Sequence, residues 1–387
     1  MIKRRDLLTI SAMLAATTSL RASDLGPLAE SIIERSQVSL VDPDRFKRVF
    51  ARAVRGEKIR IGFIGGSITA GARASVPQNS YTARVCDWWR KTFPKARIEM
   101  VNAAVGGTGS LYGSLRVGQE LLSHHLDAVI IEFAVNDAWT DQEPFESLVR
   151  HVLTSSPDIA VMLLFMMYDD GASEQEWQQR IGVHYKLPMV SYRDAVWLEL
   201  QSGRLKTTDV LMDTVHPNDF GHRIAAELVT AELETLRRAE AGDGSLFALP
   251  PPLFGARFQN ARWVAATKLK PNIIEGWTLT KTSDPPPHAL GPEIWLADPD
   301  TESALCLEWE GTGLVAVMMR ENGDTNVLTL EIDGTVAQTI TAETQPQRNV
   351  VTVALDLPKR RHRFSVSRKF GNGARPFFGL YGIGIIP

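Results

Sequence analysis

Residues 58–69 read Lys-Ile-Arg-Ile-Gly-Phe-Ile-Gly-Gly-Ser-Ile-Thr, and the fold can be traced outward from this stretch. Its first part, Lys58–Ile64, is a short apolar run of the length typical of a β-strand. Two glycines follow at once, so the strand should run into a tight turn that presents Ser67. A helical pattern with apolar residues on one face comes next, over Tyr81–Phe93. The stretch therefore predicts a strand–turn–helix unit with a serine just past the strand.

Strand and helix patterns then alternate as far as residue 237. Short apolar runs predict further strands at Ile98–Val105, Asp127–Phe133, Ile159–Met167 and Met189–Tyr192. Apolar residues with helical spacing predict helices at Leu111–His125, Phe145–Leu153, Glu174–Tyr185 and Gly221–Arg238. The run at 127–133 is apolar enough to be buried on both faces. This alternation predicts an α/β fold over residues 58–238, a parallel sheet between two helical layers.

The sequence changes character after this unit. Residues 239–252 combine small residues with a proline run, which is typical of a linker. Beyond them, short runs predict strands at Ala304–Trp309, Gly313–Met319, Val327–Ile332, Asn349–Leu355 and His362–Ser367. Glycine-containing turns separate several of these runs, at 322–324, 333–334 and 371–373. We therefore expect residues 253–387 to form an all-β sandwich of jelly-roll type.

The first 22 residues are predicted to be an export signal. Residues 3–5 are Lys-Arg-Arg, Thr9–Leu20 is mildly apolar, and Ala22 follows as a cleavage point. The paired arginines resemble a twin-arginine signal, with an ordinary Sec signal as the alternative. The apolar segment is too short to span a bilayer. We therefore expect a periplasmic or secreted protein, no stable membrane insertion of the mature chain, and a lead-in segment over residues 23–57.

Composition narrows the functional classes. The 387 residues are 44% hydrophobic and 22% charged, as in ordinary globular proteins. A formal net charge of -3 gives no reason to expect nucleic-acid binding. Cys86 and Cys306 fall in different predicted units, so no disulfide framework is indicated. His124 and His125 are adjacent and would point in different directions on a helix, so no metal site is expected.

Five residues on four separate segments fit one another chemically. Ser67, Gly106 and Asn136 each lie just past the end of a predicted strand, which is where ligands bind in a parallel α/β sheet. Asp213 lies three residues before His216, close enough for its carboxylate to reach the imidazole ring. Each motif alone fits a turn or a helix cap. Their combination at strand ends instead predicts one catalytic site.

These residue types suit acyl-ester chemistry. Ser67 is a weak nucleophile until a base takes its proton, and the imidazole of His216 is the natural base. Asp213 would fix the imidazole tautomer and stabilise the protonated ring. The backbone N–H groups of Ser67 and Gly106 and the side-chain amide of Asn136 are the predicted donors to the oxyanion of the tetrahedral intermediate.

Taken together, the four sequence blocks resemble the SGNH (GDSL-type) hydrolase superfamily over residues 58–237. The resemblance implies a flavodoxin-like, three-layer αβα domain and the same roles for the five residues above. The sequence departs from the usual pattern at two positions: Gly66 stands where an Asp usually precedes the serine, and Ala134 stands where a Gly is usual. The Gly-Gly-Ser-Ile-Thr variant is similar to that of bacterial SGNH proteins that act on acylated carbohydrates.

We therefore expect an exported serine esterase that removes short acyl groups, acetyl first among them, from a carbohydrate or polysaccharide through an acyl-enzyme. This chemistry requires no metal or organic cofactor. One alternative is an acyltransferase that uses the same triad to modify an exopolysaccharide, such as a cellulose-type glucan. The other is a non-catalytic carbohydrate-binding protein that keeps the fold. The sequence leaves the oligomeric state open.

Aromatic residues near the predicted site and in the β-unit have two interpretations each. Candidates to line or support the pocket are Tyr81, Trp139, Tyr168 and His222. The tryptophans of the β-unit that could stack on a sugar are Trp263, Trp277, Trp295 and Trp309. For both groups, packing in the core is the commoner role of such side chains.

Overall fold

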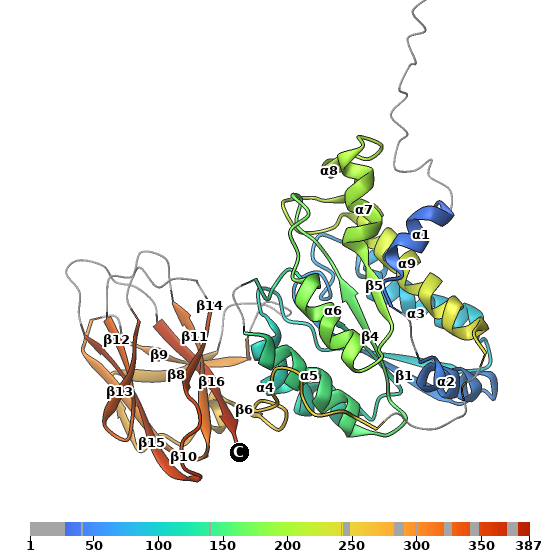
Figure 1. Ribbon diagram of the computed structural model, residues 1–387. Helices are drawn as coiled ribbons and strands as arrows, with labels where there is room; N and C mark the ends of the chain where they lie inside the picture. The colour runs from blue at the N-terminus through green and yellow to red at the C-terminus, as the bar shows by residue number, and fades with distance from the viewer. Residues whose placement is uncertain are drawn as a thin grey trace, which may run out of the picture.

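The structure is a computed structural model, and it describes residues 28–39, 42–138, 141–240, 242, 248–281, 290–298, 300–320, 327–340, 348–369 and 378–387. Within these residues the chain forms an α/β unit followed by an all-β unit (Figure 1). The predicted export signal, residues 1–22, lies outside the described residues, as do the predicted turns at 322–324 and 371–373.

Five parallel strands form the sheet of the first unit. They are β1 (Lys58–Gly65), β2 (Arg97–Asn102), β3 (Ala128–Glu132), β4 (Ala160–Phe165) and β5 (Met189–Ser191). Their order is β2-β1-β3-β4-β5, which is the flavodoxin-like order of a doubly wound sheet. The predicted α/β fold class and all five predicted strands are confirmed. The carboxyl ends of β1 and β3 lie side by side, as the prediction of a single site requires.

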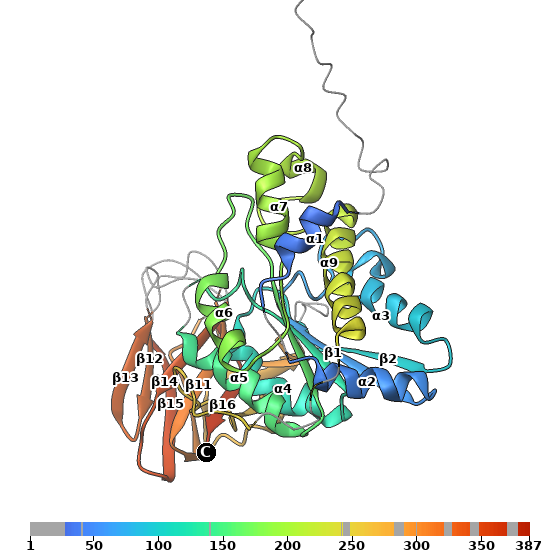
Figure 2. The same ribbon diagram turned by 45° about the vertical axis from the view of Figure 1, so that its right-hand side comes forward.

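Helices cover both faces of this sheet (Figure 2). One layer contains α1 (Glu30–Ser36), α2 (Asp44–Val54), α3 (Tyr81–Thr92), α7 (Tyr192–Gln201) and α9 (Asp219–Arg238), with the short α8 (Thr207–Val210) beside α9. The other layer contains α4 (Ser110–Glu120), α5 (Gln142–Ser155) and α6 (Gln175–His184). In β3, Ala128 and Ile130 face the first layer, and Val129 and Ile131 face the second. This strand is therefore buried on both faces, as its sequence predicts.

Two predicted elements end earlier than expected. The predicted strand at 98–105 stops at Asn102, whose amide donates to the Thr69 carbonyl (2.8 Å) and so connects the strand end to the turn after β1. The predicted helix at 111–125 stops at Glu120 and continues as a short 3-10 turn. His125 then adopts a left-handed φ of 52°, which no helix can continue.

Four helices were not predicted from the sequence, namely α1, α2, α7 and α8. Residues 23–57, predicted only as a lead-in, contain α1 and α2. In α2, Phe46, Val49 and Phe50 are buried on the sheet with the i, i+3, i+4 spacing of an amphipathic helix. α7 begins directly after β5, where the Ser191 hydroxyl accepts the Asp194 N–H (2.9 Å) as an N-cap.

The second unit is a sandwich of two antiparallel sheets, ordered β13-β12-β15-β10-β7 and β14-β11-β16-β9-β8, with β6 paired to β16. Its strands are β6 (Arg262–Ala265), β7 (Ile273–Glu275), β8 (Trp277–Lys281), β9 (Glu293–Ala297), β10 (Ser303–Gly311), β11 (Gly313–Arg320), β12 (Val327–Ile332), β13 (Thr335–Ile340), β14 (Arg348–Ala354), β15 (Arg360–Lys369) and β16 (Phe378–Ile386). The five predicted strands correspond to β10, β11, β12, β14 and β15. The predicted turn at Asp333 and Gly334 joins β12 to β13 with φ values of 54° and 81°, as a two-residue hairpin turn requires.

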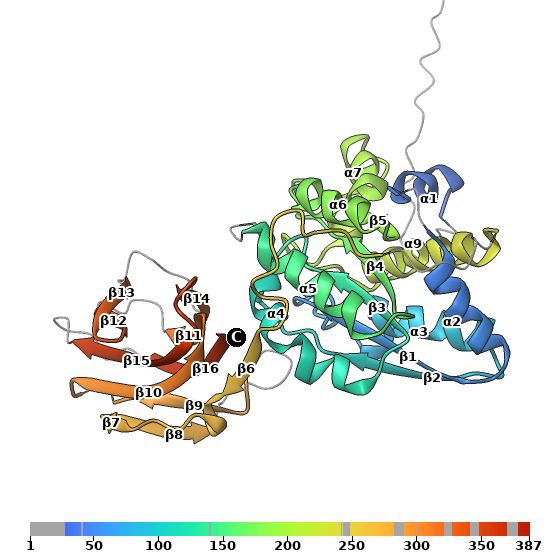
Figure 3. The same ribbon diagram turned by 60° about the horizontal axis from the view of Figure 1, so that its bottom comes forward.

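The two units share a hydrophobic cluster. On α4, Tyr112 and Leu115 pack with residues of β6, β11 and β16. Figure 3 shows β6 beside α4. The Tyr112 ring lies edge-on to Trp263, with 5.4 Å between centroids, and its hydroxyl donates to the Leu290 carbonyl (2.7 Å). On α5, the buried Glu146 carboxylate accepts the backbone N–H groups of residues 253–255. The β-unit therefore supports α4, the helix that follows the Gly106 loop.

The four tryptophans named as candidates in the β-unit pack against the interior, and none of them is fully exposed on its surface. Trp263, Trp277 and Trp309 are buried. Trp295 is half-buried, and its indole N–H donates to the Ala266 carbonyl (3.1 Å). These positions agree with the commoner role of tryptophan in a sandwich core.

Candidate active site

Ser67 lies on the turn immediately after β1 and is partly exposed. Backbone hydrogen bonds close this turn, from Ala70 N–H to the Gly66 carbonyl (3.1 Å) and from Ala72 N–H to the Ser67 carbonyl (2.9 Å). Gly65 is required here, because a Cβ at this position would lie 2.5 Å from the Glu132 carbonyl oxygen. The turn thus fixes the serine backbone and leaves its hydroxyl accessible.

The structure brings Ser67, His216 and Asp213 into one hydrogen-bonded series. His216 Nε2 lies 2.8 Å from Ser67 Oγ. His216 Nδ1 lies 2.9 Å from each carboxylate oxygen of Asp213. This is the order of contacts in which a serine transfers its proton to a histidine held by a carboxylate.

The loop that carries Asp213 and His216 is held from two sides. Met212 N–H donates to the His216 carbonyl (2.9 Å), which closes the loop on itself. The Thr214 carbonyl accepts the Asp169 N–H (2.8 Å) from the loop after β4. The histidine is therefore positioned by the backbone as well as by the carboxylate.

Asp213 is held as a carboxylate. Its partial burial would raise its pKa, but the backbone N–H and ring of His216 and the backbone N–H of Val215 donate to it and outweigh that effect. The pKa of Asp213 is consequently held well below its ordinary value. A carboxylate that stays ionised can stabilise a protonated imidazole beside it.

Asn136 fits into the space left by Gly66. A Cβ on Gly66 would lie 2.1 Å from Asn136 Oδ1 and 2.9 Å from Nδ2, so no larger residue fits there with Asn136 in place. Among the described residues, Asn136 Oδ1 is buried without a hydrogen-bond partner. The asparagine side chain therefore packs directly against the turn that carries Ser67.

Gly106 lies on a neighbouring loop that runs along the end of β1. The Val105 N–H donates to the Gly65 carbonyl (3.1 Å), which places Gly106 beside the turn after β1. Gly106 itself is buried, and α4 begins four residues later. The structure thus places all five predicted site residues at the carboxyl edge of the sheet.

A buried hydrogen-bonded series lies beneath the turn and was not predicted. The Thr69 hydroxyl donates to Glu132 Oε2 (2.9 Å) and lies 2.8 Å from the Tyr81 hydroxyl. Glu132 is fully buried, and burial raises its pKa to about 7. Its other oxygen, Oε1, has no hydrogen-bond partner within the described part of the chain. The signal in the sequence was a glutamate inside an otherwise apolar central strand, because a carboxyl in such a place needs a specific partner.

A second unpredicted feature is the loop after the Ser67 turn. Arg73, which has a left-handed φ of 66°, directs its Nε to Asp213 Oδ2 (3.1 Å). The Asp219 carboxylate at the start of α9 accepts the N–H and hydroxyl of Ser75, and His222 Nε2 lies 3.0 Å from the Ala72 carbonyl. The loop is therefore tied to α9 while its arginine reaches the triad carboxylate.

The aromatic candidates for the pocket have different positions. Tyr81 and His222 are buried and stack on each other with 6.4 Å between ring centroids, so they support the site from below. The hydroxyl of Tyr168 donates to the Val135 carbonyl (2.7 Å), next to Asn136. Trp139 lies outside the described residues.

The sequence also raised the questions of a disulfide bond and of a membrane-spanning segment. Cys86 and Cys306 are both buried and unpaired. Across the described ranges, no helix has the length and apolar character needed to cross a membrane.

Comparison with known proteins identifies the family of the chain. Residues 63–224 match the model of the GDSL-like lipase/acylhydrolase family. The crystal structure of a two-domain esterase active on acetylated mannans is similar over 91% of this chain and 98% of that chain, with 30% sequence identity and a TM-score of 0.80. The structure of such an esterase co-crystallised with mannopentaose is similar over 91% and 97%, with 29% identity and a TM-score of 0.79. No match was found among the curated proteins. The chain belongs to the GDSL-like lipase/acylhydrolase family, the SGNH hydrolases, as its motifs predict.

Proposed function

We propose that this protein is a serine esterase that removes short acyl groups, acetyl first among them, from a polysaccharide. The observation that carries the proposal is the hydrogen-bonded series from Asp213 through His216 to Ser67, at the sheet edge where family members of this fold bind ligands. Family membership supports ester chemistry, and the similarity to a two-domain esterase active on acetylated mannans supports the substrate class.

In the proposed reaction, Ser67 Oγ attacks the ester carbonyl while His216 Nε2 takes its proton. The C–O bond to the sugar then breaks, the protonated imidazole returns the proton to the sugar oxygen, and the acyl group stays on Ser67. Water then attacks the acyl carbon as it loses a proton to His216. The bond from the acyl carbon to Ser67 Oγ breaks, the imidazole returns the proton to Oγ, and the acyl group leaves as a carboxylic acid. Asp213 keeps the histidine oriented and balances its charge throughout.

The oxyanion of each tetrahedral intermediate needs donors in fixed positions. We assign this role to the backbone N–H groups of Ser67 and Gly106 and to the amide Nδ2 of Asn136. The contact of Asn136 with Gly66 supports the assignment, because it keeps the amide beside the serine.

A polysaccharide substrate would be met outside the cytoplasm. We propose that residues 1–22 form a twin-arginine export signal that directs the enzyme to the periplasm or the exterior. The basic Lys-Arg-Arg start and the short apolar segment carry this proposal. The test fuses residues 1–22 to a reporter protein and measures its export. The control is the same fusion with both arginines replaced by lysine.

The direct test of the function is ester hydrolysis by the purified protein. We expect hydrolysis of p-nitrophenyl acetate and release of acetate from acetylated mannan, with both activities lost in Ser67→Ala. Equal activity in Ser67→Ala would refute the proposal. Transfer of the acyl group to an added saccharide instead of water would identify the protein as an acyltransferase.

A further inference from the structure

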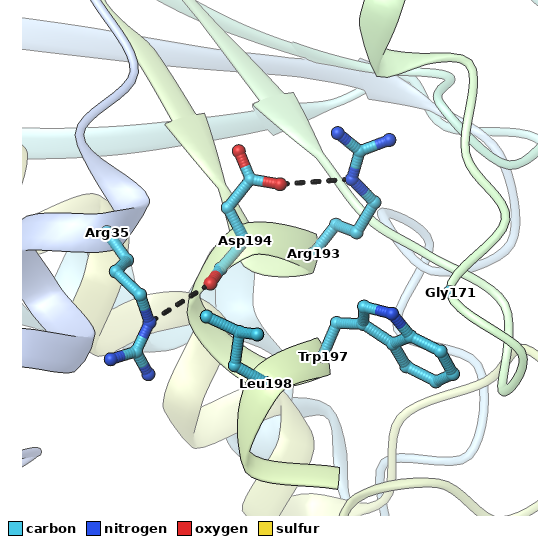
Figure 4. Close-up of a pocket in the computed structure, with 6 residues that line it drawn as sticks. All are labelled: Arg35, Gly171, Arg193, Asp194, Trp197 and Leu198. Atoms are coloured by element: carbon cyan, nitrogen blue, oxygen red, sulfur yellow. Dashed lines mark hydrogen bonds and ion pairs between the residues drawn. The ribbon is translucent and has the colours of Figure 1, made fainter. Parts of the chain in front are cut away.

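A pocket that the ester chemistry does not use lies at the same edge of the sheet as Ser67. It has a volume of about 460 Å³ and is lined by Arg35, Gly171, Arg193, Asp194, Trp197 and Leu198 (Figure 4). Its residues come from α1, from the loop after β4 and from the first turns of α7. The carboxyl ends of β4 and β5 lie here, two and three strand positions along from β1. At a strand spacing of about 4.8 Å, the pocket lies roughly 10–14 Å along the edge from the nucleophile.

The indole of Trp197 forms one wall of this pocket and is held in place. A Cβ on Gly171 would lie 2.7 Å from both Cδ2 and Cε2, the two atoms shared by the fused rings. Such atoms can be approached this closely only from a face of the ring, so Gly171 covers one indole face. Gly171 also has a φ of +82°, which favours glycine at this position. Trp197 remains half-buried, so part of the ring is available to a ligand.

The charged groups of the pocket are already paired with one another. Arg35 donates to the backbone carbonyls of Asp194 (3.2 Å) and Ala195 (3.0 Å) and to Glu199 (2.5 Å). Arg193 pairs with Glu176 and with Asp194. Because each of these arginines has a carboxylate partner, an anionic ligand would gain little net attraction. A neutral ligand with many hydroxyl groups could bond to these fixed groups without breaking the pairs.

The remaining wall is apolar and open. Leu198 is 48% exposed although it lies beside Trp197 on α7. An indole and a leucine next to a rim of paired polar groups suit a molecule with an apolar face and a polar edge. A sugar ring has this form, since its C–H groups gather on its faces and its hydroxyls lie at its rim.

The pocket is connected to the catalytic loop by a short path. Gly171, which packs on Trp197, belongs to a turn closed by the hydrogen bond from its N–H to the Tyr168 carbonyl (3.0 Å). In the same turn, Asp169 N–H holds the Thr214 carbonyl, between Asp213 and His216 (2.8 Å). A chain of sugars bound against Trp197 would therefore lie along the edge that leads to Ser67.

We propose that this pocket is an accessory subsite for an unacylated unit of a neutral hexose chain. The proposal rests on the proposed function, which supplies the polysaccharide. The subsite would hold the chain while a distant acylated unit of the same chain reaches Ser67. It would therefore contribute to the affinity for a polymer and not to the cleavage of a small ester.

The test compares a polymer with a small ester in the full-length mature protein. Leu198→Glu places a carboxylate in the pocket at an exposed position, and Val54→Glu is the matched control at another exposed apolar position, 64% exposed at the end of α2. For Leu198→Glu we expect the KM for acetylated mannan to rise about tenfold, a typical loss for a key contact. Its kcat, and its kcat/KM for p-nitrophenyl acetate, should stay at the level of the control. Trp197→Ala should show the same pattern, provided that its melting temperature shows a folded protein.

Titration with mannopentaose separates this proposal from the proposed function, because it needs no ester cleavage. We expect calorimetric binding to the unmodified protein that is weakened about tenfold in Leu198→Glu and unchanged in Val54→Glu. If binding depends on Leu198 but no ester is cleaved, the subsite stands and the proposed function fails. If esters are cleaved but Leu198→Glu matches Val54→Glu in both assays, the subsite is refuted.

Discussion

Asp213 and Glu132 each reach the turn that carries Ser67 through one side chain, His216 for the first and Thr69 for the second. The surroundings of Asp213 favour the ionised carboxylate, whereas those of Glu132 favour the neutral acid. Asp213 is partly exposed and accepts several N–H donors, so its pKa is lowered and it stays ionised. Glu132 is fully buried with a single hydroxyl donor, so its pKa is raised to about 7 and it is neutral in mildly acidic solution. Burial raises the pKa of Glu132, whereas at Asp213 the donors from His216 and Val215 outweigh the effect of burial. The first carboxyl is therefore suited to charge stabilisation and the second to shaping the turn.

The largest expected effect comes from removing the charge of Asp213. Asp213→Asn keeps the size of the side chain but cannot hold the neutral His216 in the tautomer that accepts a proton from Ser67. We expect kcat to fall by about 10⁴, as such a change costs in a serine triad. Steady-state kinetics on p-nitrophenyl acetate measures this loss. A fall of less than tenfold would show that Asp213 does not have the triad role.

A second prediction concerns the fit of Asn136 against Gly66. Asn136→Ala removes one proposed oxyanion donor and should lower kcat by about 10²–10³. Gly66→Ala should have a similar effect with Asn136 still present, because its Cβ would occupy the position of the amide. Gly291→Ala is a suitable control, since its φ is not left-handed and the atoms nearest to a Cβ there would lie at 3.7 Å, an ordinary contact distance. Normal kcat in Gly66→Ala would mean that the amide can move without loss.

Glu132 should affect stability more than chemistry. Its folded pKa of about 7 lies above its ordinary value of 4.5, so its contribution to stability is complete below about pH 4.5 and is lost as the pH rises through 7. Glu132→Gln resembles the neutral acid and cannot ionise. From pH 5 to pH 8, the free energy of unfolding of the unmodified protein should fall. In Glu132→Gln this fall should be smaller by on the order of 3 kcal/mol.

Denaturant titrations at several pH values measure this difference. The buried Asp137, whose pKa burial also raises to about 7, is present in both proteins. Its charge raises the pKa of Glu132, so the difference between the two profiles includes this coupling. Glu240→Gln, at an exposed position, is the control and should leave the profile unchanged. Parallel profiles for Glu132→Gln and the unmodified protein would show that Glu132 is already ionised in the fold. Glu132→Leu should in addition lower kcat, because it leaves the Thr69 hydroxyl without its acceptor.

The smallest expected effect comes from Arg73, whose side chain is 58% exposed. Its ion pair with Asp213 is open to solvent, and such pairs contribute about 0–1 kcal/mol. Arg73→Gln should therefore change kcat/KM by less than about fivefold, with an effect that shrinks as salt is added. A loss comparable to that of Asp213→Asn would instead place Arg73 in the catalytic machinery.

The sequence predicted the α/β layers and the position of the site because both depend on local patterns. Apolar runs and glycine turns mark the ends of β1, β2 and β3, and parallel strands bring those ends to one edge. Ser67, Gly106 and Asn136 were found in this way. Their position beside one another follows from the parallel order of the sheet, whereas His216 lies on a loop between α8 and α9 that is held by the loop after β4.

Other parts could not be predicted because they depend on contacts between distant segments. Glu132 is recognisable as unusual in an apolar strand, but its partner Thr69 lies on another segment. The pocket at Trp197 was missed because α7 was not predicted, and it is completed by Arg35 from α1. In the β-unit, β6 was missed because its role is to pair with β16 and pack on α4, which no local pattern reveals.

The central claim is that Ser67 is a nucleophile activated by His216 and Asp213. The most direct measurement is covalent labelling with a fluorophosphonate ester, followed by mass spectrometry of the digested protein. The account predicts one label per chain, located on Ser67, with much slower labelling in His216→Ala and Asp213→Asn. Labelling at another residue, or labelling of Ser67 at the same rate in all three proteins, would contradict it.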